Sequence, residues 1–144
     1  MATRVLDVLE QKGRGVVSVA PEQTVASVAQ VLTENHIGAA PVIDQRGGLA
    51  GIIYESDIVR GLSRHGPVAL TLPAAQLMTT EVRTCSPGDA IVQLMEIMTN
   101  QRIRHLPVIE NNALQGIVSI GDVVKQRLAE AQLELEELRR YIAS

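Results

Sequence analysis

Two pairs of polar residues, at the ends of the stretch from Arg104 to Asp122, have types suited to phosphate chemistry. Arg104 and His105 precede a short apolar run, and Ser119 and Asp122 follow another. Arginine presents several fixed N–H donors to phosphate oxygens, and histidine can add a further donor. Ser119 to Asp122 has the spacing that opens a helix, and helix N-termini attract anions. The stretch is therefore a candidate site for phosphate.

The same four residues also have structural interpretations. Ser-x-x-Asp matches a capping box, in which the two side chains satisfy free backbone N–H groups at a helix start. Arg104 could be an exposed charge at a strand edge, and His105 an ordinary packed residue. The elements that position these residues must decide between binding and structure.

An internal repeat accounts for most of the chain and supplies those elements. A shift of 66 residues, which becomes 65 after a one-residue gap in a turn, aligns the two halves. The aligned pairs include Pro21 with Pro87, Pro41 with Pro107, Val42 with Val108, Gly51 with Gly116 and Asp57 with Asp122. The two halves should therefore share one fold.

Each half reads as β-α-β-β-α, because a short apolar strand and a proline precede an amphipathic helix, a hairpin and a second helix. We expect strands at 16–19, 39–43 and 49–54 with helices from Thr24 and over 56–62, and strands at 82–85, 106–109 and 114–119 with helices from Asp89 and Gly121. Residues 3–11 predict a short helix of the first repeat, and 63–73 predict the connector. Such small sheets cannot cover their own apolar faces, so the repeats should pack together.

The last helix is longer than its counterpart in the first half. Apolar residues recur at spacings of four and three, at Val124, Leu128, Ala131, Leu135, Leu138 and Ile142. This pattern suits a short coiled-coil seam between two chains, but it equally suits a helix that lies on its own domain.

Composition describes an ordinary globular protein and excludes several classes. Of 144 residues, 46% are hydrophobic and 20% charged, with a net charge of -3. The negative charge and the near absence of aromatic residues argue against a nucleic-acid surface. No apolar segment approaches the length of a membrane span, and the first residues lack the apolar core of a signal peptide, so we expect a cytoplasmic protein that does not enter membranes. Cys85 is a single cysteine, which excludes an intrachain disulfide and leaves no cysteine-rich metal motif.

The sequence resembles the tandem CBS motifs that form a Bateman module. The resemblance rests on the paired strands PVID and PVIE, on GIIYESD and GIVSIGD, and on MTTEVRT before the second repeat. It implies an α+β fold in which two β-α-β-β-α repeats pack pseudo-symmetrically, with an extended C-terminal helix. Residues 1–66 would form the first repeat with the N-terminal helix, and 67–144 the second repeat with the long C-terminal helix.

The resemblance also implies binding residues, because many family members bind adenosine-containing ligands between their repeats. The ribose-binding pattern Gly-apolar-x-Ser/Thr-x-x-Asp matches Gly116, Ser119 and Asp122, and a carboxylate accepts hydrogen bonds from sugar hydroxyls. Asp57 is the corresponding carboxylate of the first repeat. Arg104 and His105 would then supply the phosphate contacts.

The clefts would be assembled across the repeats, as in the family. Ser119 and Asp122 would face Gly38, Ala39 and Ala40, whereas Asp57 would face Arg104 and His105. The base would rest near Arg14 and Val16 in one cleft and near Thr80 and Val82 in the other. Tyr54 departs from the pattern, since it stands where Ser or Thr is expected, and it would either stack on a base or fill the cleft.

These features together favour a non-catalytic sensor that binds AMP, ADP, ATP or NAD(H), with S-adenosylmethionine as a further family ligand. We expect a homodimer that can engage another protein, with no metal site and no catalytic cofactor. No phosphate-binding GxxxxGK[ST] loop is present, and no base accompanies Ser119, so the residues do not indicate an enzyme. A ligand-free dimerisation or interaction scaffold is the alternative.

Overall fold

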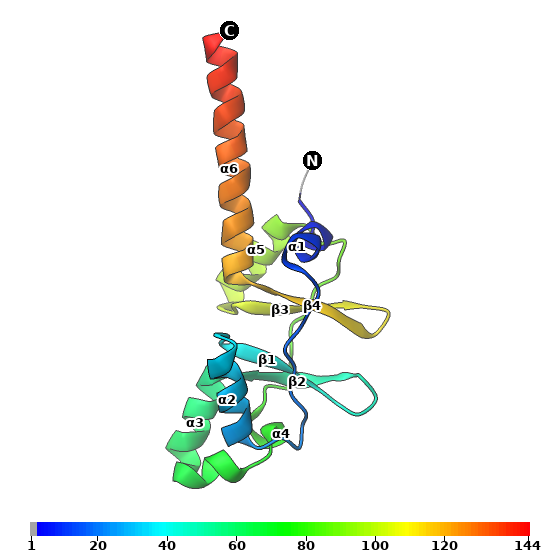
Figure 1. Cartoon of the computed structure of the whole chain (residues 1–144), viewed down its shortest axis with the longest axis vertical. Coiled ribbons are helices and arrows are strands. Elements are labelled where there is room, and N and C mark those ends of the chain that lie inside the picture. Colours follow the sequence, from blue (N-terminus) through cyan, green and yellow to red (C-terminus); the bar gives the residue numbers. More distant parts are fainter. Residues whose placement is uncertain (1–2) are drawn as a thin grey trace.

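The computed structural model describes residues 3–144, which form two lobes stacked along the long axis of the molecule (Figure 1). The elements are α1 (Val5–Lys12), α2 (Val25–Glu34), β1 (Ala39–Ile43), β2 (Leu49–Tyr54), α3 (Glu55–His65), η1 (Gly66–Thr71), α4 (Ala74–Leu77), α5 (Ile91–Gln101), β3 (His105–Glu110), β4 (Ala113–Ser119) and α6 (Ile120–Ala143). Mixed helices and strands confirm the α+β class. The hairpins of the two lobes face each other (Figure 1).

The two hairpins have matching registers. β1 pairs with β2 and β3 with β4, both antiparallel, and each register shifts at the same point of the repeat, between Val42 and Ile43 or between Val108 and Ile109. Asn111 and Asn112 supply the second turn with positive φ angles of 53° and 62°, a conformation that asparagine tolerates better than most residues. The predicted hairpins are confirmed.

The expected first strand of each repeat is wrong in extent. Only Val19 and Cys85 bridge the neighbouring strands, in parallel, to Val42 and Val108. To extend the parallel pairing, the residue two positions after Val19 or Cys85 would have to donate its backbone N–H to the neighbouring strand. These residues are Pro21 and Pro87, and proline has no N–H to donate. Each sheet is therefore two-stranded, with a single bridge at its side.

The N-terminal helix packs in the lobe opposite to the one we expected. Val5, Val8 and Leu9 of α1 are buried with residues of α5, β3 and β4, in the core of the second repeat. Backbone hydrogen bonds support this position, because Val5 N donates to Asp89 O at 2.9 Å. A helical period shows that one face is buried, but it does not identify the surface that buries it.

The segment between the repeats packs on the first lobe in the corresponding way. Ala74 of α4 lies in the core of the first repeat, with Leu77 and Met78 against it. The predicted connector at 63–73 is largely helical rather than a plain linker, since α3 continues to His65, η1 follows, and Ala69 is fully buried. The division of the chain at residue 66 stays a prediction.

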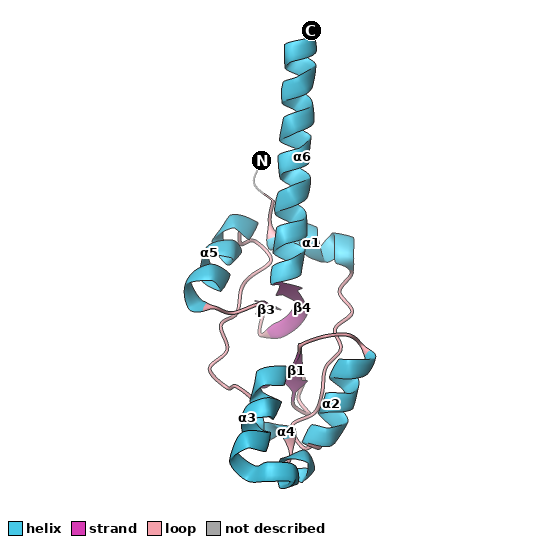
Figure 2. Cartoon of the chain, turned by 90° about the vertical axis from the view of Figure 1, so that its left-hand side faces the viewer, coloured by secondary structure: helices cyan, strands magenta, loops and turns pink. Residues whose placement is uncertain are grey.

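The two helices that follow the hairpins begin close to where the sequence placed them, but α6 leaves the body of the protein. Its first turns pack against β4 and α5, with Val123 buried. From residue 131 onward every residue is exposed, and the helix projects beyond both lobes (Figures 1 and 2). The alternative of a helix lying on its own domain is therefore wrong for this half of α6.

Candidate functional site

Two clefts lie between the hairpins of the two lobes. The first, with a volume of about 570 Å³, is lined by Asp57, Tyr54 and Thr79 on one side and by Arg104 and His105 on the other. The second, of about 340 Å³, is lined by Gly38 and Ala39 on one side and by Ser119 on the other. Both volumes fall in the range of small-molecule sites. Residues of opposite repeats thus line both clefts together, although Asp122 and Ala40 are not among the lining residues of the second.

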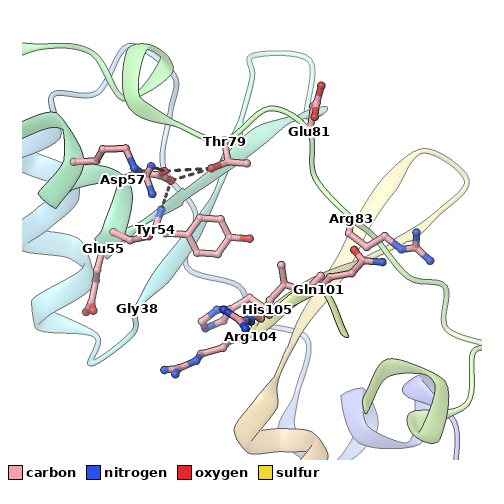
Figure 3. A pocket seen from close by; sticks show the side chains of 14 residues that line it. Gly38, Tyr54, Glu55, Asp57, Thr79, Glu81, Arg83, Gln101, Arg104 and His105 are labelled. Carbon is pink, nitrogen blue, oxygen red and sulfur yellow. Dashed lines mark hydrogen bonds and ion pairs between the residues drawn. The ribbon is translucent and has the colours of Figure 1, made fainter. Parts of the chain in front are cut away.

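Asp57 is the buried carboxylate of the first cleft (Figure 3). It is 4% exposed. Its Oδ2 accepts a hydrogen bond from Tyr54 N at 2.9 Å, and Oδ1 accepts one from Arg60 Nη1 at 2.9 Å. The Thr79 hydroxyl donates to this carboxylate as well, 3.3 Å from Oδ1 and 3.2 Å from Oδ2. These three donors occupy most of the about four acceptor sites of a carboxylate, and the 4% exposure of Asp57 leaves a sugar hydroxyl little access to the rest.

Asp122 begins α6 and belongs to a capping box. Its Oδ2 accepts from Ser119 N at 2.9 Å, while Ser119 Oγ accepts from Asp122 N at 3.2 Å. Lys12 of α1 donates from Nζ to the same Oδ2 at 2.7 Å and to Ile117 O at 2.9 Å. Among residues 3–144, no group donates a hydrogen bond to Asp122 Oδ1. One oxygen of this partly exposed carboxylate is therefore without a hydrogen-bond partner in the described chain.

The electrostatic environment keeps Asp122 ionised. Burial raises the pKa of this carboxyl group, but hydrogen bonds from Lys12 and the Ser119 backbone, with the charge of Lys12, outweigh burial and hold the pKa below its ordinary value of 3.8. Lys12 was missed from the sequence, because it ends a helix that we had placed on the other lobe.

His105, like Gly38, lines both clefts. Its ring lies 6.2 Å from that of Tyr54, tilted by 56°, and Figure 3 shows Tyr54 lying between Asp57 and the His105–Arg104 pair. The buried Nδ1 atom has no hydrogen-bond partner among the described residues. Burial, followed by the positive charge of Lys12, lowers the pKa of His105 from 6.5, against the raising effects of Asp122 and Glu55.

The remaining predicted contacts divide into two groups. Val16, Gly38, Ala39 and Tyr54 line a cleft, whereas Arg14, Ala40, Thr80, Val82 and the side chain of Asp122 do not line either of these two clefts. Ala40 is fully buried in the first core. Arg14 instead donates to Gln115 Oε1 at 3.3 Å.

Thr80 and Val82, which we expected to contact the base, do not line the first cleft. Their neighbours Thr79, Glu81 and Arg83 line it instead. Successive side chains of an extended segment point in opposite directions, so a shift of one residue reverses which of them face the cleft. Thr79 faces inward because its backbone pairs with Ile52, through hydrogen bonds of 2.9 and 2.7 Å. The sequence holds no signal for this pairing.

Acidification should destabilise the folded protein through His105. The unfolded chain binds a proton near the ordinary pKa of 6.5, whereas the folded protein binds it only at lower pH. Stability is therefore full above about pH 6.5 and falls as the pH drops below that value. Urea unfolding at about pH 7.5 and pH 5.5 measures how much free energy of unfolding is lost on acidification, and this loss should be smaller for His105→Gln than for the native protein. The control is His65→Gln, at the exposed end of α3, which should lose as much stability as the native protein. Equal losses in all three proteins would contradict this role of His105.

Comparison with known proteins gives a consistent family match. The CBS domain model matches residues 12–64 and 74–129. The chain is 33% identical over 149 residues to the mitochondrial CBS domain-containing protein CBSX3 of Arabidopsis thaliana, with 98% of this chain and 72% of that protein covered. The CBS-domain containing protein ATU1752 of Agrobacterium tumefaciens is 45% identical, with a TM-score of 0.84 over 88% of this chain and 95% of the other.

A more distant structure shares the fold alone. The CBS domain pair of protein MJ0100 is 22% identical, with a TM-score of 0.79 over 90% of this chain and 99% of the other, and its structure is a complex with 5′-methylthioadenosine and S-adenosyl-L-methionine. Two further findings concern residues 3–144 of the present chain. No helix there is long and apolar enough to cross a membrane, and no three His, Cys, Asp or Glu side chains gather where they could hold a metal ion.

Proposed function

Because this chain belongs to the CBS-domain family and carries two tandem CBS motifs, we propose that it is a regulatory module that binds an adenosine-containing ligand, AMP, ADP, ATP or NAD(H), between its repeats. The proposed consequence of binding is a change in the arrangement or partners of the module. Such a change requires a ligand that binds one arrangement more tightly than the other.

The observation that carries this proposal is the carboxylate of Asp122. The capping box and Lys12 fix one of its oxygens, and Oδ1 accepts no hydrogen bond from another described residue. Its low pKa keeps the group ionised at neutral pH, and an ionised carboxylate is a strong acceptor for two sugar hydroxyls. Ser119 lines the adjacent cleft and can add a hydroxyl contact.

The charges around the first cleft favour a ligand with phosphate groups. Arg83, Arg102 and Arg104 line this cleft, and none of the three forms an ion pair with another residue of the described chain. The carboxylates of Glu55 and Glu81 line the same cleft. Guanidinium groups are well suited to phosphate oxygens. The three arginines are therefore the groups to which we assign the phosphates of a nucleotide, whereas the MJ0100 complex contains S-adenosyl-L-methionine.

Thermal unfolding with millimolar AMP, ATP, NADH or S-adenosylmethionine tests the proposal. A ligand at about one hundred times its dissociation constant adds about 2.7 kcal/mol of stability. We expect at least one nucleotide to raise the melting temperature of the native protein. The same nucleotide should not raise the melting temperature of Asp122→Ala. Asp7→Ala is the matched control, because Asp7 occupies the same capping position in α1, where it accepts from Arg4 N at 2.9 Å, but lines neither cleft.

The outcomes separate two different errors. An unchanged rise in Asp122→Ala would show that a ligand binds but that Asp122 does not hold its sugar. No rise with any of the four compounds would favour the second candidate function, a ligand-free dimerisation or interaction scaffold. The observation that favours this candidate is the burial of Asp57, whose carboxylate already accepts hydrogen bonds from three donors of the protein.

We propose a non-catalytic role for the module, with the nucleotide acting as a regulatory ligand rather than as a catalytic cofactor. The curated relative CBSX3 is named for its CBS domains and not for a reaction. Turnover of a nucleotide by the purified protein would contradict this proposal. The expected cytoplasmic location stays a prediction.

A further inference from the structure

The projecting half of α6 carries an apolar stripe that covers nothing in its own chain. Leu128, Leu135, Leu138 and Ile142 are 61%, 47%, 54% and 74% exposed. Every residue from 131 to 144 is exposed, and both views show the helix standing clear of the two lobes (Figures 1 and 2). A stripe of this kind on a polar helix is the usual sign of a helix–helix interface.

The spacing of the stripe specifies the kind of interface. In heptad positions, Leu128, Leu135 and Ile142 occupy a, whereas Val124, Ala131 and Leu138 occupy d. A repeat of 3.5 residues keeps such a seam facing one partner helix in a left-handed coiled coil. We infer that α6 pairs with α6 of a second copy of this chain, in a parallel and in-register coiled coil.

The charges beside the seam select a second copy and a parallel direction. Glu134 occupies g and Arg139 occupies e of the following heptad, and these positions face each other across a parallel pair. Each α6 would therefore contribute one Glu134 and one Arg139 to two symmetric ion pairs. An antiparallel seam with the same leucines would instead place Glu134 opposite Glu134 of the second copy and Lys125 opposite Arg139.

Glu134 and Arg139 are also free to make these contacts. Neither forms an ion pair with another described residue, whereas Arg127 pairs with Glu130 at 2.8 Å and Arg140 with Glu136 at 3.9 Å on the same helix. Glu134 and Arg139 are therefore both available for a contact across the seam, as is Lys125 at another e position, whereas Arg127 at g is already paired. This inference does not depend on the proposed ligand.

The pairing would connect the assembly to the second cleft through one unbroken helix. α6 begins directly after Ser119, which lines that cleft, and Asp122 lies in its first turn. A parallel seam places both modules at the same end of the coiled coil, so the two copies of this cleft would lie at its base.

Sedimentation velocity of the full chain over a wide concentration range tests the pairing. We expect a concentration-dependent dimer, and we expect Leu135→Asp to be monomeric with an unchanged far-ultraviolet circular dichroism of the module. Leu133→Asp is the control, because Leu133 is 55% exposed but occupies f, outside the seam. A native chain that stays monomeric, or a Leu135→Asp chain that still dimerises, would overturn the inference.

Charge exchange and crosslinking test the direction. Glu134→Arg should weaken the dimer about ten-fold, since two attractive pairs become repulsive, and adding Arg139→Glu should restore it. Leu138→Cys should form a disulfide-linked dimer on mild oxidation, whereas Leu133→Cys should not. The native Cys85 does not interfere, because it is 5% exposed and burial raises its thiol pKa to about 12. Failure of the double exchange to restore the dimer, or absence of the Leu138→Cys crosslink, would show that the helices are not parallel and in register.

Discussion

Replacing Leu9 with alanine should lower the free energy of unfolding by about 3 kcal/mol, as expected for a large side chain removed from a close-packed core. Leu9 is fully buried, although it precedes both repeats in the sequence. Its side chain lies directly over Gly116 in β4, where an added Cβ would be only 2.7 Å from Leu9 Cδ2. The cavity would therefore open in the second lobe, between α1 and the β3–β4 hairpin.

Chemical denaturation measures the size of this effect, and amide exchange locates it. Val59→Ala is the matched control, because Val59 is 65% exposed and its truncation should change stability by less than about 0.5 kcal/mol. In Leu9→Ala, amide protons of β3 and β4 should exchange faster relative to those of β1 and β2. Faster exchange confined to the first hairpin would contradict the position of α1 on the second lobe.

Gly51→Ala should destabilise the first lobe by about 2 to 3 kcal/mol, because the new methyl group has no room. A Cβ at this position would lie 2.5 Å from the backbone oxygen of Thr79 and 3.0 Å from Met78 Sδ. The segment after α4 that carries Thr79 would have to move, which breaks its two hydrogen bonds with Ile52. Because Thr79 donates to Asp57, the first cleft should change as well.

The second repeat supplies the comparison for this substitution. Gly116→Ala meets the end of the Leu9 side chain instead of a backbone atom, and a side chain can rotate away more easily. Gly15→Ala has nothing within 4 Å of the new atom and should be nearly neutral. Urea unfolding of the three variants should rank Gly51→Ala as the most damaging, and a Gly116→Ala protein that is less stable than Gly51→Ala would refute the argument.

Much of the fold follows from local patterns in the sequence. The alternation of apolar and turn residues predicts both hairpins. The first agrees with β1 and β2 to the residue, whereas β3 is one residue longer at each end than expected and β4 begins one residue earlier. The internal repeat supports the prediction of the second hairpin, because Pro107 and Gly116 align with Pro41 and Gly51 of the first. Hydrogen bonds between neighbouring strands and helical turns are short-range, so local residues determine them.

Part of the candidate site was also predictable, for a different reason. Ser119 and Asp122 lie in one helical turn, and their spacing alone brings them together at the start of α6. The family resemblance predicted that Asp57 faces Arg104 and His105, and all three residues line the first cleft. Whether these residues bind a ligand stays a prediction.

Tertiary packing alone decided the partners of these residues. The amphipathic pattern of residues 3–11 required a buried face, but both lobes offer apolar surfaces, so the pattern could not select the second lobe or reveal Lys12 beside Asp122. The choice of Thr79 over Thr80 depends on a backbone pairing with Ile52, which lies far away in the sequence. Periodicity thus determined which faces of the chain are buried, whereas only the folded structure decided which surfaces meet, because apolar burial depends on area and fit and carries no local signal of its partner.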